Sequence, residues 1–219
     1  MSRSTAFEQY PDVEIIRRIL QGETALFEIL IRRCNSVLYK TGRSYGFTHE
    51  DTQDLMQDSF IDAYRNLAGF EGRSVFRTWI TRIMLNNCFR RRQRAAYRNA
   101  DSSIINEGAK PLFANPDAAD PSKTVVMKEL GVIVENALQE LSLDYRLVFS
   151  LREINGFSVE ETANVLDISQ ANVKTRLTRA KAMLRTEIER SYRKEEIFEF
   201  NLVYCDAMVH RVMKRLQQA

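Results

Sequence analysis

A chain of 219 residues, 44% hydrophobic and 28% charged, has the composition of an ordinary globular protein and can bury a sizeable core. Its net charge of +3 is too small to indicate a partner, and its three scattered cysteines, with no CxxC pair, argue against a disulfide framework. The first residues lack the apolar segment of a signal peptide, and no apolar run approaches the ~18 residues of a membrane span. We therefore expect a cytoplasmic protein without membrane insertion.

Charge is unevenly distributed along the sequence. Residues 73–98 contain eight arginines and no acid, and residues 174–185 also lack acids. Residues 50–62, by contrast, hold five acids and no base. Segregation of this kind indicates more than one charged surface for partners.

Residues 12–98 are predicted to form consecutive helices, because apolar residues recur there at spacings of three and four. Thr48, with Asp51 three residues later, has the pattern of a helix N-cap. The pattern breaks between Gly69 and Gly72, before the next helix begins. The apolar stripes comprise Ile15, Ile16, Ile19 and Leu20; Leu26, Phe27, Leu30, Ile31, Cys34 and Leu38; and Leu55, Met56, Phe60, Ala63, Tyr64 and Leu67.

The stretch from 76 to 94 combines a buried stripe with an arginine-rich surface. The stripe comprises Phe76, Trp79, Ile80, Ile83, Met84 and Cys88. Because Trp79 lies within it, we expect a core residue there rather than a platform for a stacked base. The arginines and asparagines on the other faces are left free to meet a negatively charged partner.

A linker is expected at 99–124, where three of the four prolines lie among polar and small residues without helical periodicity. Helical patterning resumes at 125 and continues to about 192, and an extension follows at 193–219. The expected fold class is therefore all-α. It comprises two small helical domains, at 12–98 and 125–192, joined by a flexible linker and followed by the C-terminal extension.

Residues 156–185 contain the most specific local motif. Ser158 and Glu161 have the spacing of a capping box, and Asp167 begins a turn after which Ser169 caps a second helix. Ala163 is small where the two helices would cross. Two short helices joined by a tight turn, the second one basic, are typical of a helix-turn-helix.

The second helix of this motif has a polar outer face without acids. Following Ser169, this face carries Gln170, Asn172, Lys174, Thr175, Arg176, Arg179 and Lys181. Amides and arginines can hydrogen-bond base edges in the major groove, and lysines and arginines neutralise phosphates. A solvated amphipathic helix is the alternative, but cap, turn, small residue and basic face together favour DNA binding.

The extension carries a further apolar stripe from Cys205 to Leu216. Such a stripe should be covered, and we expect it to pack against one of the domains or a regulator. Cys205 and His210 are too few to indicate a metal site, and a core cysteine and a surface histidine are expected instead.

Three motifs in this order resemble the extracytoplasmic-function class of bacterial sigma factors. They are DLMQDSFIDAY at 54–64, FRTWITRIMLN at 76–86, and the segment 141–185. The resemblance covers about 12–98 and 128–190. It implies an alternative sigma factor, a transcription initiation factor that binds core RNA polymerase and directs it to promoter DNA without a cofactor. It also implies an anti-sigma factor as a partner, since family members are often held inactive by one.

The resemblance assigns core polymerase binding to the helix at 51–64. The implied contact residues are Asp51, Asp54, Leu55, Gln57, Asp58 and Phe60. Aspartates at 51, 54, 58 and 62 would form an acidic stripe suited to a basic partner. A solvated acidic face is the alternative, and the family resemblance favours docking.

The resemblance also implies two promoter-binding surfaces. The residues assigned to the minus-ten element and its melted strand are Phe70, Arg73, Arg77, Arg82, Asn86, Asn87, Arg90 and Arg91. Those assigned to the minus-thirty-five duplex run from Ser169 to Lys181 on the outer face described above. The sequence departs from the family pattern at Ser142, often a proline, at Asp167, often a glycine, and at Arg90, often an acid.

Two other classes of function are alternatives to a sigma factor. A free-standing helix-turn-helix regulator would bind duplex DNA without polymerase, but 12–98 shows no ligand-sensing pattern. An enzyme acting on nucleic acid would need a catalytic site, and the two histidines lie far apart without a nucleophile elbow or phosphate loop. Asp54, Asp58 and Asp62 could in principle bind magnesium. We expect neither enzymatic activity nor a bound metal.

Overall fold

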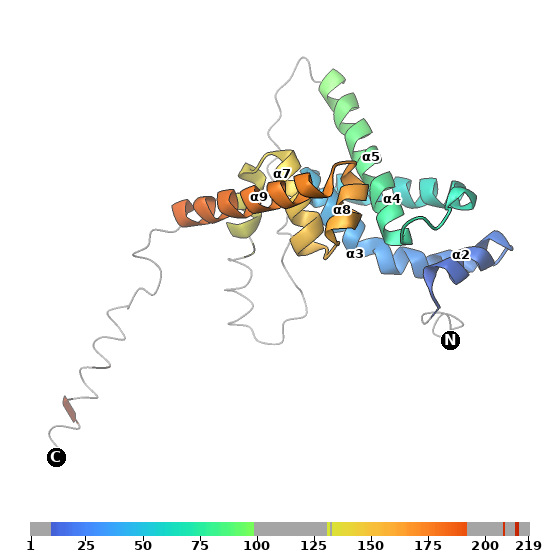
Figure 1. Ribbon diagram of the computed structural model, residues 1–219, viewed down its shortest axis with the longest axis horizontal. Helices are drawn as coiled ribbons and strands as arrows, with labels where there is room; N and C mark the ends of the chain where they lie inside the picture. The colour runs from blue at the N-terminus through green and yellow to red at the C-terminus, as the bar shows by residue number, and fades with distance from the viewer. Residues whose placement is uncertain (1–9, 99–130, 132, 192–207, 209–212, 215–219) are drawn as a thin grey trace.

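The computed structural model describes residues 10–98, 131, 133–191, 208 and 213–214. These residues are mostly helical and form no strand, so the expected all-α fold class is confirmed (Figure 1). The predicted linker at 99–124 and most of the extension lie outside the described residues. Met208 and Met213, from the predicted apolar stripe, are exposed, and what covers that stripe stays a prediction. None of the described helices has the length and apolar character needed to span a bilayer.

The first half of the described chain is a helical bundle whose last helix extends beyond it. It comprises α2 (Asp12–Leu20), the short turn η1 (Thr24–Leu26), α3 (Phe27–Tyr45), α4 (His49–Arg65), the short turn η2 (Leu67–Gly69) and α5 (Phe76–Arg98). Helices α3, α4 and α5 pack on one another, and the C-terminal part of α5 projects away from the bundle (Figure 1).

Local sequence explains where these helices end and how closely they pack. Gly46 ends α3 in the left-handed conformation, with φ of 101°, and Thr48 caps α4 by accepting a hydrogen bond from the Asp51 N–H at 3.1 Å. Gly42 lies where α3 meets its neighbours. A Cβ there would lie 2.7 Å from Thr52 Cγ2 and 2.8 Å from Met84 Cε, so glycine is required for this approach.

The core of the first half follows the predicted stripes except at Leu20 and Tyr64, which are 53% and 40% exposed. In α5, four side chains predicted to be in the core are at most 1% exposed: Phe76, Ile80, Met84 and Cys88. Trp79 and Ile83 differ, because they are only partly buried and pack at the edge of the core.

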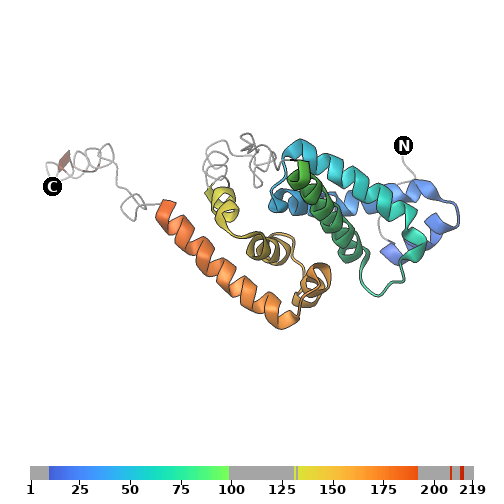
Figure 2. The same cartoon turned by 90° about the horizontal axis from the view of Figure 1, so that it is seen from above.

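The second half is built around two smaller apolar clusters. Residues 133–140 are helical, and α7 (Leu143–Phe149), η3 (Ser150–Ile154), α8 (Val159–Leu166) and α9 (Gln170–Ser191) follow. One cluster joins 137–141 to Ala180 and Leu184 of α9, and the other joins Val148, Ala163 and Val173. Helix α9 lies along the outer edge of this half, on the side away from the first half (Figure 2).

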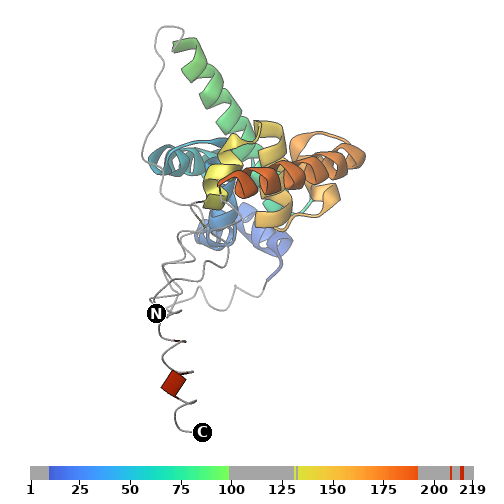
Figure 3. The same cartoon turned by 90° about the vertical axis from the view of Figure 1, so that its left-hand side faces the viewer.

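The two halves pack against each other. Helix α8 contacts α5, while α7 and η3 contact α3 (Figure 3). Leu147, Leu151, Phe157 and Val165 of the second half belong to the same buried cluster as the core of the first. The sequence did not predict this contact.

Candidate nucleic-acid and polymerase interfaces

The predicted polymerase-binding residues fall on two sides of α4. Asp54, Gln57 and Asp58 are exposed, and Asp51 lies in the first helical turn beside its Thr48 cap. Leu55 and Phe60 have only 2% and 7% of their surface exposed, so they anchor the helix to the core. The exposed residues could meet a partner directly in this conformation, whereas Leu55 and Phe60 would act by holding α4 in place. The binding role of all six stays a prediction.

Arginines of α5 pair with the acids of α4. Arg91 forms an ion pair with Asp51 and lies 3.7 Å from Asp54, and Arg90 lies 4.0 Å from Asp62. These side chains are partly exposed, so each pair contributes only about 0–1 kcal/mol. The predicted polymerase-docking acids and part of the predicted minus-ten surface are therefore neighbours.

Asn87 links α4 to α5 through all the polar atoms of its side chain. Its Nδ2 donates to Ser59 Oγ and to Asp62 Oδ2, both at 3.1 Å, and its Oδ1 accepts from Arg90 Nη2 at 2.6 Å. Asn87 is only 8% exposed. In this conformation it positions Arg90 and is closed to bases, although the sequence suggested an exposed contact.

Two hollows lie beside this link. The larger, of about 750 Å³, runs between α4 and α5 and is lined by acids of α4, including Asp58, and by arginines of α5, including Arg94. A smaller hollow of about 360 Å³ is lined by Trp79, Asn86 and Arg90 among others. Trp79 is thus both a core-edge residue and part of a surface with exposed Asn86. Sequence periodicity alone placed it entirely in the core.

The remaining predicted minus-ten residues lie near the start of α5. Phe70 packs on Phe76 and Trp79, with ring centroids 5.8 and 5.3 Å away. Arg73 and Arg82 are exposed, and Arg73 forms an ion pair with Glu71. Arg77 points toward the second half.

The predicted helix-turn-helix is confirmed in its local detail. The Ser158 side chain accepts from the Glu161 N–H at 3.0 Å, and the Glu161 carboxylate accepts from the Ser158 N–H at 2.7 Å, which is a capping box. Asp167 makes the turn in the left-handed conformation, with φ of 55°. The Ser169 hydroxyl then accepts from the Asn172 N–H at 3.2 Å and caps α9.

The outer face of α9 is open to solvent. Gln170, Lys174, Thr175 and Arg179 are exposed, and Asn172 is partly buried. Two of the predicted cations are held by acids of the same half: Arg176 pairs with Asp144 at 3.1 Å, and Lys181 with Glu153 at 3.0 Å. Among the described residues, the face combines amides with cations that have no ion-pair partner or only a partly exposed one, which suits contact with duplex DNA.

The described residues contain no group of three histidine, cysteine or acidic side chains that could hold a metal ion. Cys34 and Cys88 are buried, and burial raises the pKa of each thiol to about 12. Thiols of this kind are unreactive core residues. Cys205 and His210, expected to be a core cysteine and a surface histidine, lie outside the described residues.

Two family models match the chain in the order in which the two halves occur. Residues 30–98 match "Sigma-70 region 2", and residues 132–184 match "Sigma-70, region 4". The chain is 29% identical over 185 residues to the ECF RNA polymerase sigma-E factor of Haemophilus influenzae, covering 83% of this chain and 97% of that protein. It is 30% identical over 178 residues to the RNA polymerase sigma-H factor of Pseudomonas aeruginosa, covering 79% and 91%.

Solved structures share the fold. The sigma factor RpoE from Bartonella quintana, in complex with the anti-sigma factor NepR, matches with a TM-score of 0.60 and 22% identity over 74% of this chain and 96% of that one. CnrH, in complex with the cytosolic domain of CnrY, matches with a TM-score of 0.58 and 25% identity over 81% and 97%.

Proposed function

The chain belongs to the extracytoplasmic-function sigma factors of the sigma-70 family, and we propose that it directs core RNA polymerase to promoters through separate surfaces for polymerase and for promoter DNA. The observation that supports this most strongly is the order of parts. A region 2 bundle with an acidic helix and an arginine-rich helix precedes a region 4 helix-turn-helix.

Docking to polymerase is assigned to the exposed side of α4. Asp54, Gln57 and Asp58 lie there together, on a helix that Leu55 and Phe60 fix to the core. A basic partner surface would gain charge-assisted contacts with the two carboxylates without any rearrangement of the bundle.

Promoter recognition is assigned to two surfaces. The arginines of α5, with Asn86, would bind the minus-ten element and the melted strand, because backbone charge supplies affinity and exposed amides can hydrogen-bond flipped bases. The outer face of α9 would read the minus-thirty-five element as duplex. Polymerase would hold both surfaces at once, so that binding of one promoter element raises the effective concentration of the other surface at its own element, and two weak contacts give tight binding together.

We further propose a cytoplasmic location and an anti-sigma factor as the regulating partner. CnrH, which is 25% identical, was solved with the cytosolic domain of CnrY. A protein that works on chromosomal promoters and meets such a partner would do both in the cytoplasm. Pull-down with candidate anti-sigma factors would test the second proposal, and failure to find a partner that blocks polymerase binding would contradict it.

Polymerase docking is tested by co-elution of the purified chain with bacterial core polymerase. We expect the variant with Asp54, Gln57 and Asp58 changed to alanine to lose co-elution. The matched control changes Gln21, Glu23 and Glu28 to alanine, which likewise removes one amide and two carboxylates from exposed positions, between the end of α2 and the start of α3. Equal co-elution of both variants would contradict the assignment, and tight duplex binding without any co-elution would favour a free-standing regulator.

A further inference from the structure

Two cations of α9 that were assigned to the promoter duplex are already held by acids of the protein. Arg176 Nη1 lies 3.1 Å from Asp144 Oδ2, and Lys181 Nζ lies 3.0 Å from Glu153 Oε1. Asp144 comes from the first turn of α7, and Glu153 comes from η3. In each pair, an acid from outside the helix-turn-helix therefore neutralises a cation inside it.

The paired cations border the outer face of α9 on both sides. Arg176 and Lys181 are five residues apart, which places them about 140° apart around the helix axis. Thr175 and Arg179 lie between them on the outer face and are exposed. A helix that enters the major groove meets base edges with its central residues and meets the phosphates of the groove walls with its flanks. The neutralised cations are therefore the ones placed to reach phosphates.

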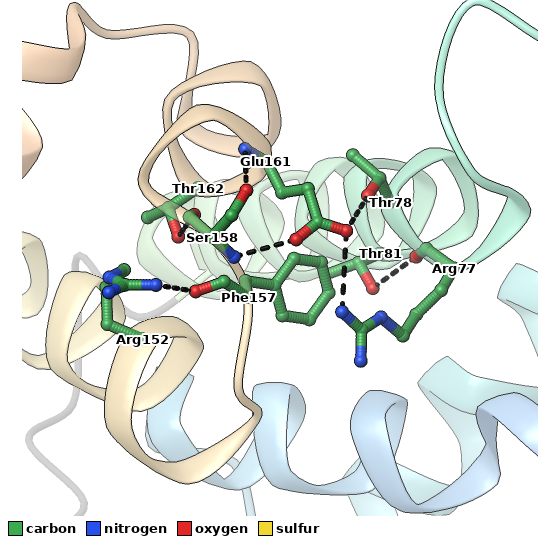
Figure 4. A network of polar contacts seen from close by, with 8 residues as sticks. All are labelled: Arg77, Thr78, Thr81, Arg152, Phe157, Ser158, Glu161 and Thr162. Carbon is green, nitrogen blue, oxygen red and sulfur yellow. Dashed lines mark hydrogen bonds and ion pairs between the residues drawn. The ribbon is translucent and has the colours of Figure 1, made fainter.

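Local contacts fix the backbone that carries each acid. At the start of α7, Arg146 Nη2 donates to the carbonyl oxygens of Gln139 at 2.8 Å and Leu141 at 2.9 Å. In η3, the Arg152 guanidinium donates to the carbonyl oxygen of Phe157, in the loop before α8 (Figure 4). The backbone of each acid therefore stays beside α9 when DNA approaches.

The pairs are exposed enough to exchange partners. The side chains of Arg176 and Asp144 are 25% and 66% exposed, and those of Lys181 and Glu153 are 52% and 36% exposed. Exposed ion pairs are weak, so a DNA phosphate can compete with the carboxylate for the cation. The displaced carboxylate still lies next to the cation, where it repels the phosphate. Each acid therefore weakens a phosphate contact without preventing it.

We propose that Asp144 and Glu153 limit the sequence-independent affinity of α9 for DNA, because they compete with backbone phosphates for Arg176 and Lys181. The inference rests on the proposed function, since it needs the outer face of α9 to meet duplex DNA. A cation that is neutralised within the protein has no counterion to release, so it adds little to affinity or to the dependence of affinity on salt. Contacts to base edges carry the sequence information and do not need these cations, so the ratio of specific to non-specific binding rises.

Neutral isosteres of the two acids test this restraint in the full chain. We expect Asp144→Asn and Glu153→Gln each to tighten binding of a fluorescein-labelled, mixed-sequence DNA duplex about threefold, roughly the share of one phosphate contact. Each should also steepen the plot of log affinity against log salt concentration by up to about 0.9. Fluorescence anisotropy at several salt concentrations measures both quantities. Glu140→Gln is the matched control and should change neither, because Glu140 is an exposed acid of the same half that pairs with no described cation of α9.

A double-mutant cycle assigns the effect to each pair. If Asp144 acts through Arg176, Asp144→Asn should have no effect on affinity in an Arg176→Ala chain. Likewise, Glu153→Gln should have no effect in a Lys181→Ala chain. If the acids only fastened α7 and η3 to α9, the acid variants would lower the melting temperature and leave duplex binding equal or weaker. Tighter binding that disappears in the cycle would establish the restraint.

Lys174→Ala separates failure of this inference from failure of the proposed function. Lys174 is exposed on α9 and forms no ion pair with a described residue, so its loss should weaken duplex binding and flatten the salt dependence by up to about 0.9. If it does so, while Asp144→Asn and Glu153→Gln bind the duplex like the unaltered chain, the restraint is overturned and the proposed function stands. Gains that persist without Arg176 and Lys181 would also overturn the restraint. If Lys174→Ala leaves binding unchanged, or if no chain binds the duplex, the minus-thirty-five assignment fails and the inference fails with it.

Discussion

Replacing Glu135 with alanine is expected to separate the two halves of the protein. The Arg43 and Glu135 side chains are 1% and 8% exposed, and their charged atoms are 2.8 Å apart. Removing one partner of such a pair costs about 3–5 kcal/mol, because the remaining charge stays buried without its ionic partner. If the two halves separated, water could reach the Arg43 guanidinium. The destabilisation caused by Glu135→Ala therefore cannot exceed the free energy with which the halves dock. If docking is worth less than 3–5 kcal/mol, the chain opens.

Small-angle X-ray scattering measures this opening directly. We expect Glu135→Ala to increase the radius of gyration and to lower the urea midpoint, followed through the fluorescence of Trp79, the chain's single tryptophan. Glu140→Ala is the control, because it removes an exposed acid from the same helical segment. A Glu135→Ala chain with the scattering curve and the urea midpoint of the unaltered protein would refute the reasoning.

Three further predictions concern local chemistry. Asp167→Gly should raise the free energy of unfolding by about 0.5 kcal/mol, because the relief of left-handed backbone strain in the folded chain exceeds the entropy that glycine adds to the unfolded chain. Thermal unfolding measures this change. A lower melting temperature would contradict the prediction. Ser158→Ala should cost about 1 kcal/mol by removing the cap of α8, and an unchanged melting temperature would show that the cap is dispensable. Cys34 and Cys88, with pKa values raised to about 12, should resist thiol reagents in the folded chain. Because the unfolded chain loses these protons near pH 9 and the folded chain keeps them, stability should fall as pH rises above 9, which urea titrations at several pH values would detect.

The sequence was informative wherever structure depends on neighbouring residues. The capping box of Ser158 and Glu161 needs residues three apart, and the left-handed turn at Asp167 depends on one residue's tolerance of positive φ. The buried stripe of α5 follows in the same way from helical periodicity. These local rules were sufficient for the all-α fold class.

Contacts between distant residues could not be predicted in this way. Arg43 is separated from Glu135 by 92 residues, and nothing in its local sequence distinguishes a buried arginine from an exposed one. Asn87 was expected to face bases because it lies among arginines. Its amide instead donates hydrogen bonds to Ser59 and Asp62 of another helix. Periodicity gives the face of a helix, whereas the partner of that face depends on the tertiary packing.

Run-off transcription on fragmented genomic DNA from the source organism tests the central claim most directly. Core RNA polymerase with the added chain should produce transcripts whose start sites share two upstream elements, at the minus-ten and minus-thirty-five positions, and these transcripts should be absent with core polymerase alone. If adding the chain yields no transcript beyond the background of core polymerase, although the chain binds duplex DNA, it does not act as a sigma factor.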